Sequence, residues 1–415
     1  MNVTSSYMNV TSSIIGAVVW VCILIIVCIV YIKLVVLSSI QYLLPSSHTA
    51  IKNVADCMST IVSEYGFREE TADISGVSVH CVIKDAVTDT TASDVSADVL
   101  VFIHGTASSS VVFFDVMKEL PRNQKCVAID LPNFGISGRI DLDKYPTNQE
   151  LCERYSDIIG HTLQKLGIVE HTVLVAHSLG GFLSVYVADR FPIKKLVLLN
   201  PAGILPTLGE YGYYWGMFFK AGLPSSLFHL PLVSRELLAY IWRSCATTTT
   251  STTDCGVSRT EFWISLFANP DNDGHRVLQR LITLRPFYSY WNTPAFTTLM
   301  DVYKKVPTHI CFGEDDTIIP SHIGDFLDEL MGGEIMIHNI KNASHNPCSN
   351  IECFLKYIDS IIKNENQPEK KRRSNFTTTR VEKSNWRYRG YSYHCLKQTK
   401  ESFQNVYDYI ITNHH

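Results

Sequence analysis

The hydrophobic pattern divides the chain into one long apolar run near the N-terminus and a larger part in which short apolar segments alternate with helix-like ones. Two segments, Glu150–Leu166 and Gly180–Phe191, have helical spacing, while Ile74–Lys84 alternates like a half-buried strand or hairpin arm. Five short and mostly apolar runs are typical of buried strands: Val99–Ile103, Cys126–Ile129, Thr172–Ala176, Leu196–Leu199 and His309–Phe312. This alternation predicts an α/β fold with a mostly parallel sheet and helices on both faces.

The first apolar run predicts a membrane anchor. Ile14–Ile32 contains no charged side chain, and Lys33 interrupts the run before it resumes. A helix of about 20 apolar residues crosses a bilayer. A secretory signal peptide would have a basic leader and a shorter apolar core. We therefore expect a single-pass transmembrane helix over residues 14–37, preceded by a short leader at 1–13.

The charges around this span predict its orientation. Lys33 and Lys52 follow it, and no Lys or Arg precedes it, which favours an outside N-terminus and a cytoplasmic main domain. Glycosylation sequons at Asn2 and Asn9 fit a lumenal leader, but further sequons lie in the part assigned to the cytosol, so sequons do not decide the topology. The pattern is compatible with the endoplasmic reticulum or another internal membrane.

The strand and helix rhythm predicts a core in two parts. We expect a connector at residues 38–70, a core over 71–202 and 298–364, and a cap insertion at 203–297. The insertion is rich in aromatics, most of which would pack its own interior, while a minority would line a pocket for an apolar substrate.

The last segment, residues 365–415, is a basic tail with interleaved aromatics. The simplest interpretation is a solvated tail. The alternative is contact with anionic lipid headgroups, which attract basic segments near a membrane.

Composition agrees with a large folded core. The 415 residues are 46% hydrophobic and 18% charged, which excludes a disordered chain. A net charge of -4 gives no overall indication of a nucleic-acid partner. The twelve cysteines form no C-x-x-C pair, so we interpret them as reduced thiols, with Cys126 and Cys311 buried in strands. In an oxidising lumen, Cys245 and Cys255 are an alternative disulfide pair.

The strongest chemical signal is the run Ala176-His177-Ser178-Leu179-Gly180-Gly181. It follows an apolar strand and precedes an apolar helix, which is the context of a strained turn that exposes a nucleophilic serine. Small residues are needed two positions before and after the serine, and Ala176 and Gly180 meet this need, although glycine is usual at position 176. The N–H of Leu179, at the helix start, is a candidate donor to a developing oxyanion.

A serine nucleophile needs a base and a carboxylate that orients the base. Asp316 follows the strand His309–Phe312 in a turn stiffened by Pro320, and Asp315 is the alternative acid. After the next predicted strand, Glu334–Ile340, His345 stands in a polar loop before a helix. His338 and His322 lie within a strand and at a helix start, which fit a catalytic base less well. We predict Ser178, His345 and Asp316 as a catalytic triad.

The loop after the first central strand supplies a second oxyanion donor. It begins His104-Gly105-Thr106. Gly105 permits a tight, open backbone there, so we assign the donor to the N–H of Thr106, with Ala107 as the alternative. His104 is interpreted as a structural hydrogen-bonding residue.

These motifs resemble the α/β-hydrolase superfamily between about Ile74 and Ile362, apart from the insertion. The resemblance rests on five signatures in chain order: His104-Gly105, D-x-P-x-x-G-x-S at Asp130–Ser137, the serine turn Ala176–Gly181, G-x-x-D-x-x-x-P at Gly313–Pro320, and His345. Within the superfamily, the chain is similar to membrane-anchored monoacylglycerol-lipase-like serine hydrolases and to a lysophospholipase and acyltransferase-like group. The H-x-x-x-x-D motif of the acyltransferase-like group is absent, because Asn350 stands five positions after His345. Ser178 excludes epoxide hydrolases and dehalogenases, which have aspartate at that turn.

The resemblance implies a serine ester hydrolase acting on a lipid such as a monoacylglycerol or lysophospholipid, without a metal or other cofactor. Three alternatives remain open at this point. They are acyl transfer to a lysolipid or other alcohol, hydrolysis of a carbon–carbon bond in a small diketone, and a non-catalytic lipid-binding scaffold.

Overall fold

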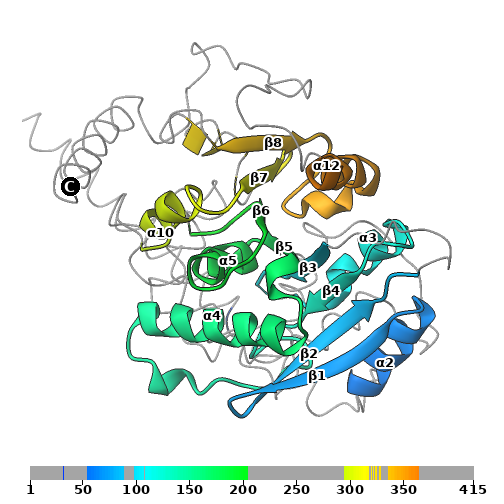
Figure 1. Ribbon diagram of the computed structural model, residues 1–415, viewed down its shortest axis with the longest axis vertical. Coiled ribbons are helices and arrows are strands. Elements are labelled where there is room, and N and C mark those ends of the chain that lie inside the picture. The colour runs from blue at the N-terminus through cyan, green and yellow to red at the C-terminus, as the bar shows by residue number, and fades with distance from the viewer. Residues whose placement is uncertain are drawn as a thin grey trace, which may run out of the picture.

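The structure is a computed structural model that describes residues 54–87, 98–106, 108–203, 294–316 and 335–363, together with Tyr31 and a few positions between 319 and 328. Its strands form an eight-stranded sheet in the order β1-β2-β4-β3-β5-β6-β7-β8 (Figure 1). β2 runs antiparallel to β1 and β4, and the remaining neighbours are parallel. The predicted α/β fold with a mostly parallel sheet is confirmed.

The five predicted strand runs correspond to β3 to β7, with ends that differ by no more than one residue. The strands are β1 (Arg68–Ile74), β2 (Val77–Lys84), β3 (Val99–Ile103), β4 (Cys126–Ile129), β5 (Thr172–His177), β6 (Lys195–Leu199), β7 (Thr308–Gly313) and β8 (Met336–Ile340). The helices are α2 (Val54–Glu64), α3 (Phe114–Glu119), α4 (Asn148–Lys165), α5 (Leu179–Arg190), α10 (Pro294–Val302) and α12 (Ile351–Lys363).

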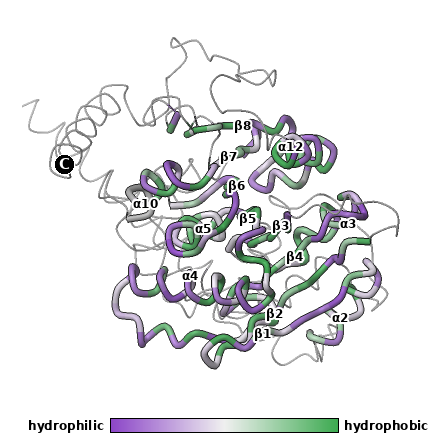
Figure 2. The backbone as a smooth tube through the Cα atoms, in the orientation of Figure 1, coloured by the Kyte–Doolittle hydropathy of each residue, from purple (hydrophilic) through white to green (hydrophobic). Residues whose placement is uncertain are grey.

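Helices cover both faces of the sheet, which explains why its central strands are almost continuously apolar. Helices α4, α5 and α10 lie on one face, and α2, α3 and α12 on the other (Figure 1). Successive strand side chains alternate between the faces: Val101 and Leu174 join the first core, and Leu100 and Val175 the second. Figure 2 shows this apolar centre running through the strands between the two helical layers.

The first hairpin shows where the hydrophobic pattern fails. β1 is an edge strand whose outer residues are exposed and charged, so it gives no apolar run. Ser75 and Gly76 join β1 to β2 with positive φ angles of 52° and 80°, the geometry of a two-residue hairpin turn. The predicted connector at 38–70 therefore needs correction, because α2 and the first residues of β1 within it belong to the folded core.

Several predicted segments lie outside the described residues. These are the leader at 1–13, the anchor at 14–37 apart from Tyr31, the cap insertion at 203–297 apart from its ends, and the tail at 365–415. Among the helices that the structure describes, none is long and apolar enough to cross a bilayer. Cys126 and Cys311 are buried free thiols as predicted, whereas Cys245 and Cys255 are not described.

The close approach of α4 to the end of α5 predicts an unusual response to alanine. A Cβ on Gly160 would lie 2.2 Å from the ring of Phe191. Alanine stabilises a helix by about 1 kcal/mol relative to glycine, but overpacking a core costs about 1–3 kcal/mol. We therefore expect Gly160→Ala to lower the free energy of unfolding in a urea titration. The exposed change Gln164→Ala on the same helix should leave it nearly unchanged, and a Gly160→Ala protein more stable than wild type would contradict the packing described.

Candidate active site

Ser178 lies at a strained turn between β5 and α5. Its φ and ψ angles are 51° and -115°, a conformation that side chains with a Cβ rarely adopt. Three backbone hydrogen bonds hold it there. The Ser178 N–H donates to Leu199 O at 2.9 Å, and the N–H groups of Phe182 and Ala202 donate to Ser178 O at 3.1 Å. The serine side chain makes no capping hydrogen bond to α5, so its hydroxyl can bond elsewhere.

Close backbone contacts explain the small residues around the serine. A Cβ on Gly180 would lie 2.4 Å from His104 O and 2.7 Å from Ile103 O, so the start of α5 rests directly on the end of β3. A Cβ on Gly105 would lie 2.9 Å from Ser178 Cβ. A Cβ on Gly181 would meet Ala176 O at 3.1 Å. These contacts place the loop after β3 against the serine.

The structure brings Ser178, His345 and Asp316 into one hydrogen-bonded chain. His345 Nε2 lies 3.1 Å from Ser178 Oγ, and His345 Nδ1 lies 2.8 Å from Asp316 Oδ2. The side chains come from the ends of different strands and are nearly buried, with the three residues 8%, 7% and 4% exposed in that order. A carboxylate only accepts, so Nδ1 carries a proton and Nε2 of the neutral ring can accept one from the serine.

Asn200 completes the surroundings of Asp316. Its amide nitrogen donates to Asp316 Oδ2, and its Oδ1 accepts from the Gly313 N–H at 3.1 Å. The Ile319 N–H donates to Asp316 Oδ1 at 2.9 Å. The alternative acid, Asp315, is exposed and makes no such contact with His345 among the hydrogen bonds described. Sequence reasoning missed Asn200, although it directly follows the buried strand β6, and a polar residue near the carboxyl end of a strand was part of the signal for Asp316.

His177 supports the loop that carries His345. Its Nε2 donates to His345 O at 2.8 Å, and the two rings lie 4.9 Å apart between centroids. Burial lowers the pKa of His177 to about 3, so this ring is neutral at pH 7. The same loop packs tightly against the end of β7, because a Cβ on Gly313 would lie 2.1 Å from Ser344 O. His177 was predicted only as part of the turn sequence, and its contact with His345 was not anticipated.

The two residues predicted to supply oxyanion donors adjoin the serine turn: Leu179 directly follows Ser178, and Thr106 follows Gly105, which packs against Ser178. Leu179 is the first residue of α5, where backbone N–H groups lack partners within the helix. His104 Nδ1 donates to Gly105 O at 2.7 Å. In a planar trans peptide the carbonyl and the next N–H point in opposite directions, so the Thr106 N–H points away from the His104 ring. His104 thus has the structural role predicted for it, while the alternative donor Ala107 is not described.

Asn200 offers a test of this arrangement. Asn200→Ala would remove a donor from Asp316 and leave the buried Gly313 N–H without its acceptor. Leaving such a group unsatisfied costs about 1–3 kcal/mol, so we expect a loss of that size in urea unfolding. Gln149→Ala, which removes an exposed amide hydrogen bond on α4, is the control and should change stability by less than about 0.5 kcal/mol. Equal stability of Asn200→Ala and wild type would contradict the assigned contacts.

The chain is similar to known hydrolases over part of its length. The chain is 22% identical over 287 residues to Monoacylglycerol lipase abhd6-A of Xenopus laevis, a match covering 64% of this chain and 77% of that protein. It is 36% identical over 132 residues to Uncharacterized hydrolase YugF of Bacillus subtilis, and 30% identical over 123 residues to Methylesterase 3 of Arabidopsis thaliana. Those two matches cover 30% and 29% of this chain, and 46% and 45% of the relatives, so the chain spans about half of their length.

Solved structures share the fold at low identity. A putative lipase from Acinetobacter baumannii gives a TM-score of 0.58 at 17% identity, covering 75% of this chain and 96% of that one. A membrane phospholipase A described as a bacterial virulence factor gives 0.54 at 15% identity, covering 81% and 98%. The profile of the "Alpha/beta hydrolase family" matches residues 100–352, which is more than half of the sequence. The chain therefore belongs to the α/β-hydrolase family.

Proposed function

We propose that this protein is a serine hydrolase that cleaves carboxylic ester bonds of a lipid, such as a monoacylglycerol or lysophospholipid, through an acyl-enzyme. The hydrogen-bonded chain from Ser178 through His345 to Asp316 carries this proposal. Its support is the position of the serine on a strained strand-to-helix turn, which presents a hydroxyl that does not cap the helix.

In the first step, His345 Nε2 takes the proton of Ser178 Oγ as the oxygen attacks the ester carbonyl carbon. Asp316 holds the Nδ1–H tautomer and stabilises the imidazolium that forms. The carbonyl oxygen becomes an oxyanion that accepts hydrogen bonds from the N–H groups of Leu179 and Thr106. When the carbon–oxygen bond breaks, His345 donates its proton to the leaving alcohol, and the acyl group remains on the serine.

The second step reverses these roles with water. His345 removes a proton from a water molecule that attacks the acyl-enzyme, and the proton then passes to Ser178 Oγ as the fatty acid leaves. The chemistry requires no metal or other cofactor, because the serine supplies the nucleophile and the backbone N–H groups supply the charge stabilisation.

A lipid substrate is favoured by the kind of relatives found and by the expected organisation of the chain. Monoacylglycerol lipase abhd6-A and Methylesterase 3 are both named for the cleavage of an ester, and the first name specifies a lipid ester. Residues 14–37 would hold the enzyme at a membrane, and the cap insertion at 203–297 would admit an acyl chain. Contact of the basic tail at 365–415 with anionic lipid remains part of this proposal.

The proposal is tested by turnover on monoacylglycerols, lysophospholipids and short p-nitrophenyl esters. We expect Ser178→Ala to lower kcat by at least about 10⁴-fold, the scale seen when a serine nucleophile is removed. The matched control is Ser184→Ala on α5, the helix that follows Ser178. The buried Ser184 hydroxyl has no partner in the described part of the chain, so this variant should keep activity.

Product analysis in the presence of a lysolipid acceptor separates hydrolysis from acyl transfer. Free fatty acid as the main product supports the proposal, and an acylated acceptor favours transfer.

A folded wild-type protein that turns over none of these esters, or a Ser178→Ala variant with wild-type activity, contradicts the proposal. The first of these results would favour the non-catalytic lipid-binding alternative.

A further inference from the structure

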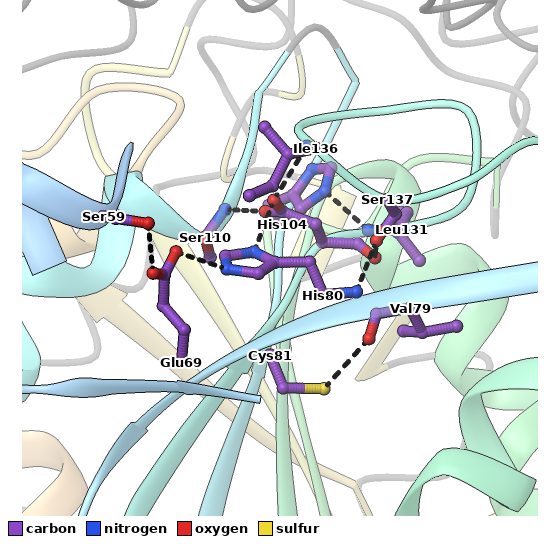
Figure 3. A network of polar contacts seen from close by, with 11 residues as sticks. Ser59, Glu69, Val79, His80, Cys81, His104, Ser110, Leu131, Ile136 and Ser137 are labelled. Atoms are coloured by element: carbon purple, nitrogen blue, oxygen red, sulfur yellow. Dashed lines mark hydrogen bonds and ion pairs between the residues drawn. The ribbon is translucent and has the colours of Figure 1, made fainter. Parts of the chain in front are cut away.

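A second polar cluster, outside the hydrogen-bonded chain of Ser178, His345 and Asp316, connects β1, β2 and β4 to the loop after β3 (Figure 3). At its centre is His80 of β2. His80 Nδ1 lies 3.0 Å from Oδ2 of Asp130, the residue that directly follows β4. His80 Nε2 lies 2.9 Å from Oε1 of Glu69 on β1. The hydroxyl of Ser59 on α2 donates to the other oxygen of Glu69. We call Glu69, His80 and Asp130 the clamp.

The clamp is charged although His80 and Asp130 are buried. Both ring nitrogens of His80 face carboxylates, which accept and do not donate when ionised, so both nitrogens carry protons. Burial opposes this charge, but the hydrogen bonds to Asp130 and Glu69 outweigh it and raise the pKa of His80 to about 9. Burial likewise opposes ionisation of Asp130, but the hydrogen bond from His80 lowers the pKa of Asp130 to about 2.

Asp130 connects the clamp to two loops. Its Oδ1 accepts from the Ser110 N–H at 2.6 Å, and its Oδ2 accepts from the Ile136 N–H at 3.1 Å. The Ser137 hydroxyl donates to Asp130 O at 2.7 Å and accepts from the His80 N–H at 2.9 Å. The loop after β4 folds closely around the carboxylate, since a Cβ on Gly135 would lie 2.3 Å from Asp130 Oδ2. The D-x-P-x-x-G-x-S signature is therefore a sequence that builds this junction.

The loop after β3 is consequently held at both ends. His104 fixes its beginning, because its Nδ1 donates to Gly105 O and its Nε2 accepts from the Leu131 N–H at 2.9 Å. Asp130 fixes its end through Ser110. Thr106 lies between these two points in the sequence, and Figure 3 labels the two residues that hold the loop, His104 and Ser110.

We propose that the clamp positions the Thr106 N–H for oxyanion binding, and that His80 is a positioning residue for the hydrolytic reaction. The proposal rests on the proposed function. A buried ion pair often contributes no more stability than an apolar pair of the same size. What the clamp supplies is a fixed acceptor for the Ser110 N–H, which an apolar replacement would not provide. The competing role is purely structural, namely attachment of the β1–β2 hairpin to the sheet.

The kinetic test uses His80→Gln, which is neutral and retains one hydrogen bond. Because an oxyanion donor acts in the transition state, we expect kcat on a short ester to fall about 10- to 100-fold while KM stays nearly unchanged. Leu163→Ala on α4 is the stability control, because it opens a cavity in the core on the face of the sheet opposite to His80. Both variants are assayed at a temperature at which each is folded.

The pH profile gives a second measurement that a structural role would not move. The groups that face His80 are Glu69 and Asp130, with His104 and Cys81 nearby. Burial lowers the pKa of His104 and raises that of Cys81, so these stay uncharged between pH 7 and 10, and both carboxylates stay ionised. Among these five described groups, only His80 changes charge in that range. The folded pKa exceeds the ordinary 6.5, so the clamp's contribution is complete below pH 6.5 and is lost as pH rises through about 9.

Wild type should accordingly lose kcat with an apparent pKa near 9, and His80→Gln should lack this decline. If His80→Gln fails to fold, Glu69→Gln serves instead, because it removes one carboxylate and should move the decline to lower pH. An active wild type with a His80→Gln variant of unchanged kcat, or with a decline that Glu69→Gln does not move, overturns the proposal. Absence of wild-type turnover would instead defeat the proposed function.

Discussion

The candidate site depends on the direct contact between the backbone at the start of α5 and the backbone at the end of β3. With any side chain at Gly180, the helix would have to move away from His104 O and Ile103 O. At this contact the chain passes from β5 into α5 through Ser178, which has a positive φ angle of 51°. The same contact brings the loop that begins at Gly105 against the serine. Ser178, the start of α5 and the loop after β3 therefore meet at this one backbone contact.

The sheet order supplies the remaining groups. Because β3, β5, β6, β7 and β8 are parallel neighbours, their carboxyl ends meet at one edge. The residues that follow these strands are polar: His104, Ser178, Asn200, Asp316 and His345. Each is tied to a neighbour from another strand, so the arrangement is a network in which every loop restrains the next. The clamp extends this network to the antiparallel side of the sheet, through β2 and β4.

The features that could be predicted from the sequence are those whose signals are local. Central strands such as Val99–Ile103 are buried on both faces, which makes them readable as apolar runs, and Ser178 stands in a motif that needs small neighbours. β1 was missed because an edge strand with exposed charges resembles a polar connector. The clamp was missed for another reason. His80 looks like an ordinary strand residue, and its partners stand 11 and 50 positions away, so only the sheet pairing brings them together.

We propose above all that Ser178 is an activated nucleophile, and covalent labelling by a fluorophosphonate tests this most directly. The reagent reacts with a serine whose proton a neighbouring base accepts, and the adduct can be assigned to a peptide by mass spectrometry. The account predicts an adduct on the peptide containing Ser178 in the folded wild-type protein, and none in Ser178→Ala. An unlabelled wild-type protein, or an adduct on another serine that persists in Ser178→Ala, would contradict it.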